Sequence, residues 1–131
     1  MNVAVAIIAV QDSQVLLVRN RKRQGSVEIP GGMVISGEGI FSAAVRELRE
    51  ETGLTIATPV GWRDLIPFDQ KTVDNWHVHI FRALRWTGKL TAGDDAENVF
   101  WGLPGLLLAG AHPEDYPIVC RAIDQHKAAF G

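Results

Sequence analysis

One acidic stretch of the sequence restricts the possible folds more than any other. Apolar residues recur in it at three- and four-residue spacing, which predicts a helix over about Gly39–Thr52. Gly53 follows as a natural C-terminal stop, because glycine adopts the left-handed conformation that ends many helices. At about 100° per residue, the packing face is centred on Leu48. It includes three more apolar residues: Phe41, Ala44 and Val45.

Three glutamates, Glu47, Glu50 and Glu51, share one flank of this predicted helix. Like charges at these spacings repel, and Arg46 offsets part of the repulsion through an i, i+4 pair with Glu50. A hard divalent cation offsets far more, and ligands that are all oxygen favour Mg²⁺ or Mn²⁺ over zinc. Such an ion activates water and neutralises charge on a phosphoryl group. The helix alone leaves one alternative open, a merely solvated acidic face.

The rest of the chain predicts a mixture of strands and helices. Strands over 3–10 and 15–19 form a hairpin around the polar 11–14 turn, and a basic loop follows over 20–26. An extended piece at 27–29 leads into Pro30-Gly31-Gly32, which we expect to break regular structure. Further strands are expected near 54–66, 77–86 and 99–101. A last helix opens at Pro117 and carries one stripe: Val119, Ile123, His126 and Phe130. The mixture indicates an α/β or α+β fold around one sheet, and we expect a single domain over 1–131.

Charge and cysteine usage exclude several classes of function. The net charge of −2 argues against general binding to nucleic-acid polymers. The apolar N-terminus lacks a basic start and is far shorter than the roughly 18 apolar residues of a membrane span, so a buried strand is expected there instead. The one cysteine, Cys120, allows no internal disulfide and suits a reducing, cytoplasmic setting.

The segment from Gly32 to Leu54 resembles the complete signature of the Nudix hydrolases. Every fixed position of that signature is filled: Gly32, Glu38, Arg46, Glu47, Leu48, Glu50, Glu51, Gly53 and Leu54. The resemblance extends outward, to the hairpin before Pro30-Gly31-Gly32 and to an acidic loop before Trp101.

This resemblance implies an α/β/α sandwich with a central mixed β-sheet, and Mg²⁺- or Mn²⁺-dependent attack of water on a phosphorus. It implies that Glu47, Glu50 and Glu51 bind metal, with Glu47 or Glu50 able to orient or deprotonate the water. A carbonyl of Gly31 or Gly32 would add another metal ligand. The remaining signature residues would support the site: Arg46 by holding a glutamate, Glu38 as an outer support, and Gly53 by shaping a loop.

Residues outside the signature are candidates for completing the site. By resemblance, Glu97 in the acidic loop would reach the metal and act as a base; Asp94, Asp95 or a solvated loop are the alternatives. A guanidinium group suits phosphate oxygens, and Arg19 is the best candidate in the basic stretch, ahead of Arg21. That stretch also holds Lys22 and Arg23, and a solvated loop is the alternative reading.

Aromatic residues are candidates for contacting the substrate. Trp76, His79 or Phe81, on an alternating strand, could stack on a base or hydrogen-bond it, with packing as the alternative. Three other tryptophans are expected to pack: Trp62, Trp86 and Trp101. Val27 stands where relatives often carry tryptophan, which weakens any transfer of substrate identity.

Four functions are compatible with these features. The first is pyrophosphohydrolysis of a nucleoside triphosphate, either standard or oxidised, to a monophosphate and pyrophosphate. The second is the same chemistry on ADP-ribose, a nucleotide sugar, a dinucleoside polyphosphate or a pterin triphosphate. The third is a silent nucleotide- or protein-binding domain, although no signature glutamate is lost. The fourth is a diphosphate isomerase, which Cys120 in the last helix disfavours. The expected partner is a small nucleotide-like molecule, with no membrane or nucleic-acid polymer, and the protein is expected to be a monomer or homodimer.

Overall fold

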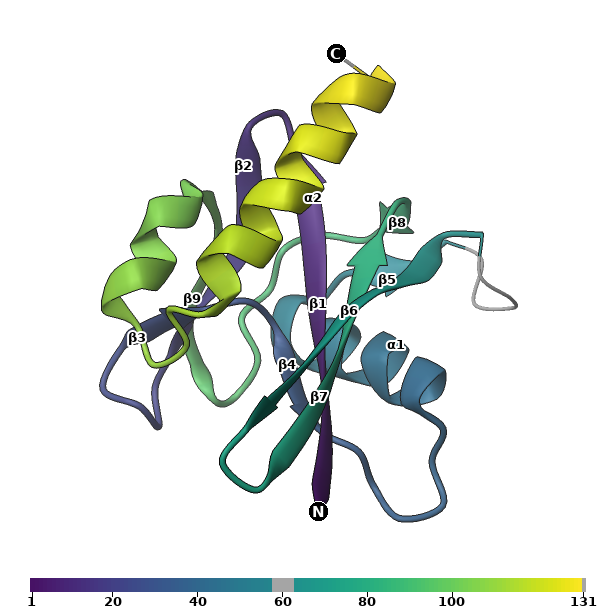
Figure 1. Ribbon diagram of the computed structural model, residues 1–131, viewed down its shortest axis with the longest axis vertical. Helices are drawn as coiled ribbons and strands as arrows, with labels where there is room; N and C mark the ends of the chain where they lie inside the picture. The colour runs from purple at the N-terminus through teal and green to yellow at the C-terminus, as the bar shows by residue number, and fades with distance from the viewer. Residues whose placement is uncertain (58–62, 131) are drawn as a thin grey trace.

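The computed structural model describes residues 1–57 and 63–130, and its elements follow one another as Figure 1 shows. Trp62 and the middle of the strand expected near 54–66 lie outside the described residues. The strands are β1 (Asn2–Gln11), β2 (Gln14–Asn20), β3 (Ser26–Glu28), β4 (Gly31–Met33), β5 (Thr55–Ile56), β6 (Leu65–Val73), β7 (Trp76–Ala83), β8 (Trp86–Thr87) and β9 (Ala96–Gly102). The helices are α1 (Ile40–Thr52), the 3₁₀ helix η1 (Pro104–Ala109) and α2 (Asp115–Phe130). Within the described part of the chain, no helix is long and apolar enough to cross a membrane.

Strand β1 is the centre of a mixed sheet. It runs parallel to β7 and antiparallel to β4, and it pairs with β2 beside the hairpin turn, through Val10–Val15 and Gln11–Gln14. Beyond that turn the two strands diverge, and β2 pairs instead with β3 and β9 (Figure 1). The predicted hairpin is therefore confirmed, and its two arms form a V.

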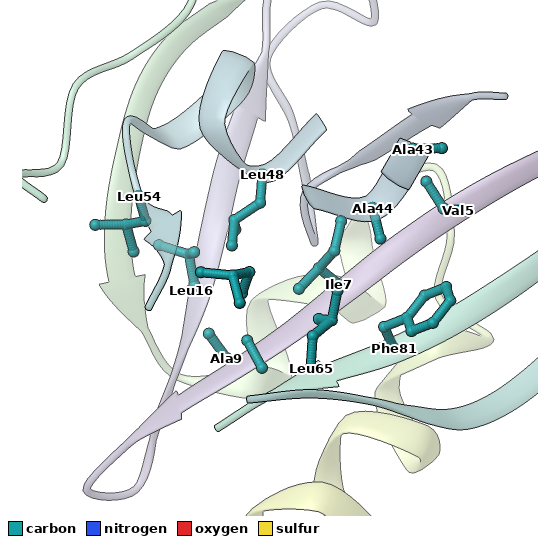
Figure 2. Packing of buried hydrophobic residues seen from close by; sticks show 12 residues of the cluster. Val5, Ile7, Ala9, Leu16, Ala43, Ala44, Leu48, Leu54, Leu65 and Phe81 are labelled. Carbon is teal, nitrogen blue, oxygen red and sulfur yellow. The ribbon is translucent and has the colours of Figure 1, made fainter. Parts of the chain in front are cut away.

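Alternation along β1 divides the core into two layers. Val5, Ile7 and Ala9 belong to the cluster that packs against Ala44 and Leu48 of α1, as Figure 2 shows, while the residues between them pack with Val119 of α2 on the other face. A strand with both faces buried reads as a continuous apolar run, which explains its uniform sequence. The structure thus confirms the α/β fold with a helix on each face of a mixed sheet.

The boundaries of α1 agree with the sequence prediction. Gly39 is the N-cap residue, and Gly53 at φ 79° ends the helix by donating its N–H to the carbonyl oxygen of Arg49. The buried face holds Leu48 and Ala44, and Phe41 and Val45 pack against the same cluster. The face that carries the glutamates is therefore turned away from the core.

Two predicted elements were only partly right. The expected break occurs at Ile29 and Pro30, between β3 and β4, but it does not extend to Gly31 and Gly32, which belong to β4 and pair with β1. A Cβ on Gly31 would collide with the carbonyl oxygen of Val5, so glycine permits the close pairing here. Among the described residues, the strand expected near 54–66 is present only at its two ends, as β5 and the start of β6, and β6 continues beyond the prediction to Val73. The sequence did not indicate the rest of β6 because its residues are largely polar. Polar residues are tolerated there because β6 pairs only with β7 among the described strands and has a solvated edge.

The C-terminal helix begins two residues earlier than predicted, at Asp115. Val119 and Ile123 are buried as expected, but Phe130 is 72% exposed, so the apolar stripe ends before the last turn. The expected packing of Trp86 and Trp101 is confirmed, because their rings stack 5.6 Å apart against the α1 side of the core.

Candidate metal centre and substrate cavity

Two glutamates of α1 lie against the backbone of β4. Glu47 approaches Gly32 so closely that a Cβ there would lie 2.5 Å from the Glu47 Cδ atom. Gly31 donates its N–H to Oε1 of Glu51 at 3.4 Å. Gly32 therefore lets the Glu47 carboxylate lie where a side chain would displace it, whereas glycine at position 31 permits the close approach to β1.

The charge of Glu51 is unfavourable in this position. Burial, followed by the neighbouring charge of Glu47, raises the pKa of Glu51 to about 8. Two nearby carboxylates in a partly dehydrated place need a positive charge if both are to ionise. The pair is thus chemically suited to a cation.

Arg46 connects the rest of the acidic group. Its guanidinium bonds both oxygens of Glu38, at 2.7 and 2.9 Å, and donates to the Met33 carbonyl at 3.0 Å. Its Nη1 lies 2.9 Å from Glu47 Oε1 and 3.1 Å from Glu50 Oε2, which is the i, i+4 contact expected from the sequence. Hydrogen bonding to Arg46 lowers the pKa of Glu38. Arg46 is therefore placed to hold the glutamates and to tie α1 to β4.

The oxygen atoms of this acidic group are ligands of the kind that a hard divalent cation prefers. They are the carboxylates of Glu47, Glu50 and Glu51 and the backbone oxygens of Gly31 and Gly32. In the rotamers present, no three acidic, histidine or cysteine side chains of the described residues are grouped tightly enough to enclose an ion. Glu50 is the freest to turn, since its side chain is 55% exposed.

A cavity of about 430 Å³ begins at this acidic group. Glu51, Gly31 and Gly32 line it together with residues of the diverging arms of β1 and β2, so the V of the hairpin forms two of its walls. Trp76 of β7, Lys71 of β6 and Asp115 of α2 also line it. This volume is typical of small-molecule sites, which range over about 300–1,000 Å³.

Lys71 and Asp115 are functional candidates that the sequence analysis missed. Lys71 Nζ lies 2.6 Å from Asp115 Oδ1 and 2.7 Å from Glu114 Oε2, and Asp115 is almost fully buried. Burial raises the pKa of Asp115, and Lys71 opposes this shift. The sequence alone does not predict this ion pair, because Lys71 and Asp115 belong to elements that are far apart along the chain.

The structure does not bring Arg19 or Arg21 to the cavity. Val18 and Asn20 of β2 line it, so Arg19 between them points to the other face, where it donates to the Gly25 carbonyl at 3.1 Å. Arg21 donates to the carbonyls of Asp94 and Ala96 and so fastens the acidic loop. Of the basic stretch over 19–23, Arg23 lines the cavity.

Of the three aromatic candidates, only Trp76 lines the cavity. Alternation along β7 turns His79 and Phe81 to the α1 face. Phe81 is 1% exposed there and its ring lies 6.4 Å from that of Phe41, so it is a core residue. His79 packs against the His77 ring at 4.7 Å, and burial lowers its pKa. Phe81 therefore packs in the core, and a substrate contact by His79 stays a prediction.

Glu97 lies exposed at the start of β9, beside Gly25. Its loop does reach α1, because Gly93 donates its N–H to the carbonyl oxygen of Glu51 at 3.2 Å. Asp95 is paired with Lys22 at 3.3 Å. A catalytic role for Glu97 stays a prediction.

Comparison with known proteins identifies this arrangement. A family model described as NUDIX domain matches residues 1–122. The chain belongs to the Nudix family. It is 43% identical over 102 residues, 77% of its length, to a Bacillus subtilis (strain 168) protein named "Putative 8-oxo-dGTP diphosphatase". It is 31% identical over 93 residues, 69% of its length, to the Nudix hydrolase YvcI of the same strain. These matches span 66% and 58% of the two relatives.

Solved structures agree with this Nudix assignment. A MutT structure from a study of the Aliivibrio salmonicida and Vibrio cholerae proteins superposes with a TM-score of 0.73 at 26% identity, covering 95% of this chain and 98% of the other. The solution structure of the E. coli ORF135 protein gives 0.69 at 29% identity, covering 99% and 93%. The likeness therefore extends along nearly the whole Nudix fold.

Proposed function

We propose that this Nudix protein hydrolyses a nucleoside triphosphate to a nucleoside monophosphate and pyrophosphate, using Mg²⁺ or Mn²⁺. The observation that carries the proposal is the position of Glu51 and the two glycines of β4 at one end of a nucleotide-sized cavity. That position joins an acidic, phosphate-handling centre to a space for the rest of the substrate. Its single cysteine further supports a cytoplasmic enzyme.

In this proposal, different residues bind the metal ion and accept the proton of the attacking water. Glu47, Glu50 and Glu51 would hold the divalent ion, with a backbone oxygen of Gly31 or Gly32. When bound, the ion supplies positive charge for the phosphate oxygens and makes a water molecule more acidic. The attacking water forms a new oxygen–phosphorus bond and loses its proton to Glu97 or to a glutamate of α1. The phosphoanhydride bond breaks, and pyrophosphate leaves with the electron pair.

Trp76 is our candidate for stacking on the base of the bound nucleotide. It lines the cavity together with Val78, and an indole next to an aliphatic wall favours a flat heterocycle. The buried Lys71–Asp115 pair lines the same space and offers a donor beside an acceptor for polar groups of the base.

A second substrate deserves a test because of one relative. An archaeal protein named ADP-ribose pyrophosphatase, from Methanocaldococcus jannaschii, is 43% identical to this chain over 54 residues. That match covers 40% of the chain, so it supports the shared chemistry more than the substrate.

The deciding assay is a screen of nucleoside triphosphates, oxidised triphosphates, ADP-ribose and nucleotide sugars with Mg²⁺ and with Mn²⁺. We expect monophosphate and pyrophosphate from a triphosphate, identified by chromatography. Cleavage of ADP-ribose or a sugar nucleotide alone would replace the proposed substrate. Tight nucleotide binding without any turnover would leave only a binding domain.

A further inference from the structure

Arg23 differs from the other cations of the basic stretch in where its side chain lies. It lines the cavity together with Glu51, and its side chain is 52% exposed, so a ligand can reach it. The pKa of Arg23 is raised, first by its hydrogen bond to Glu28 and also by the charges of Glu28 and Glu51. Arg23 therefore lies near the junction between the acidic centre and the cavity.

The neighbouring cations are engaged elsewhere. Arg19 donates to the Gly25 carbonyl and lies 5.9 Å from the Phe100 ring centroid. Arg21 is bound to carbonyl groups of the acidic loop, and Lys22 is paired with Asp95. None of these three lines the cavity. An anionic substrate in the cavity thus meets one cation of this stretch, Arg23.

Glu28 fixes the direction in which Arg23 points. Arg23 Nε and Nη2 donate to the two oxygens of Glu28, at 2.7 and 2.8 Å, in the paired geometry that guanidinium and carboxylate favour. Glu28 is only 5% exposed, and Asn20 donates to it at 3.3 Å. Asn20 also accepts from the backbone N–H groups of Lys22 and Arg23 and so shapes the loop. Among the described residues, Nη1 of Arg23 has no acceptor, which leaves donors for another anion.

We propose that Arg23 binds the phosphate chain of the substrate and that Glu28 is its positioning residue. This inference rests on the proposed function for its substrate, a nucleoside polyphosphate. It assigns the phosphate chain a path from the glutamates of α1 past Arg23. A guanidinium with two donors committed to Glu28 still offers its outer edge to phosphate oxygens.

The test compares Arg23→Gln with Lys22→Gln, a matched loss of one charge at the next position. The first readout is the affinity for inorganic tripolyphosphate with Mn²⁺, measured by calorimetry, because it needs neither a base nor turnover. We expect about a 10- to 100-fold loss for Arg23→Gln, the size of a lost hydrogen bond between charged groups, and no comparable loss for Lys22→Gln. Arg23→Lys should recover part of the loss. Thermal melting of each variant shows whether it is folded.

The positioning role of Glu28 has its own readout. Glu28→Gln should raise the KM for the nucleotide with a smaller change in kcat, and adding Arg23→Gln should cause little further loss, because both changes disable one contact. Equal losses for Arg23→Gln and Lys22→Gln, or unchanged tripolyphosphate affinity in both Arg23 variants, would overturn the inference. Failure of the proposed function is distinguishable, since wild-type protein would then cleave no nucleotide while the tripolyphosphate comparison still reports on Arg23.

Discussion

Replacing Gly32 with alanine is expected to lower turnover and metal affinity while leaving the free energy of unfolding nearly unchanged. A Cβ at position 32 would lie 2.5 Å from Cδ and 2.6 Å from Oε2 of Glu47. Ordinary carbon contacts are about 3.5–4.0 Å, so the carboxylate must retreat by roughly 1 Å. The retreat breaks the 2.9 Å contact between Glu47 and Arg46. The atoms that the new Cβ would meet are the carboxylate atoms of Glu47, at the end of a flexible side chain. The side chain can therefore move while the fold stays intact.

The expected loss of stability is much smaller than the expected loss of turnover. Losing one partly exposed ion pair costs up to about 1 kcal/mol of unfolding free energy. Misplacing a catalytic group by about 1 Å can cost on the order of 100-fold in rate. We therefore expect Gly32→Ala to melt close to the wild type, but to lose about 100-fold in turnover and to bind Mn²⁺ more weakly.

Gly31→Ala is the matched control. Its Cβ would meet the backbone of β1, at the Val5 carbonyl and 3.0 Å from Ala6 Cα, and neither can move without opening the sheet. Overpacking of this kind costs about 1–3 kcal/mol, so this variant should unfold at lower urea. Circular dichroism, a Mn²⁺ titration and the turnover assay together decide the matter. Wild-type turnover and Mn²⁺ affinity in Gly32→Ala would refute the placement of Glu47 at the metal.

Four further changes test other parts of the structure. Leu48→Ala empties a fully buried position beneath α1 and should lower the unfolding free energy by about 2–5 kcal/mol, measured by urea denaturation. The pKa of Glu51 is raised from 4.5 to about 8, so metal-free folded protein binds a proton that the unfolded chain has lost, and stability falls as the pH rises between these values. Glu51→Gln in EDTA should remove that slope; an unchanged slope would contradict the assignment. Glu97→Gln should lower kcat far more than it changes substrate affinity, and near-normal turnover would remove Glu97 from the mechanism. Trp76→Ala should raise the KM for nucleotide while tripolyphosphate affinity stays constant; a parallel loss of both would exclude a stacking role.

Local sequence features predicted the acidic helix and the two-sided core. The boundaries of α1 follow from apolar spacing and a terminal glycine at Gly53, which act within a few turns of chain. The continuous apolar run of β1 likewise predicted a buried strand. The signature residues predicted the site as a group, because one helix carries most of them.

Contacts between distant residues could not be predicted in the same way. The pairing of Gly31 with β1 depends on a close approach of two strands, so local rules found the break at Pro30 but not the strand that begins directly after it. The sequence favoured Arg19 over Arg23, but strand alternation turns Arg19 away from the cavity, while a bidentate contact with Glu28 holds Arg23 beside it. Lys71 and Asp115 meet only once β6 and α2 are in place.

The cavity between the diverging strands β1 and β2 takes its other lining residues from separate parts of the chain. Gly31, Gly32 and Glu51 come from β4 and α1, whereas Lys71, Trp76 and Asp115 come from β6, β7 and α2. Under the proposed function, hydrolysis and recognition of the base therefore draw on different stretches of the chain. Substitutions at Lys71, Trp76 and Asp115 would then change which base is bound while the glutamates of α1 stay as they are.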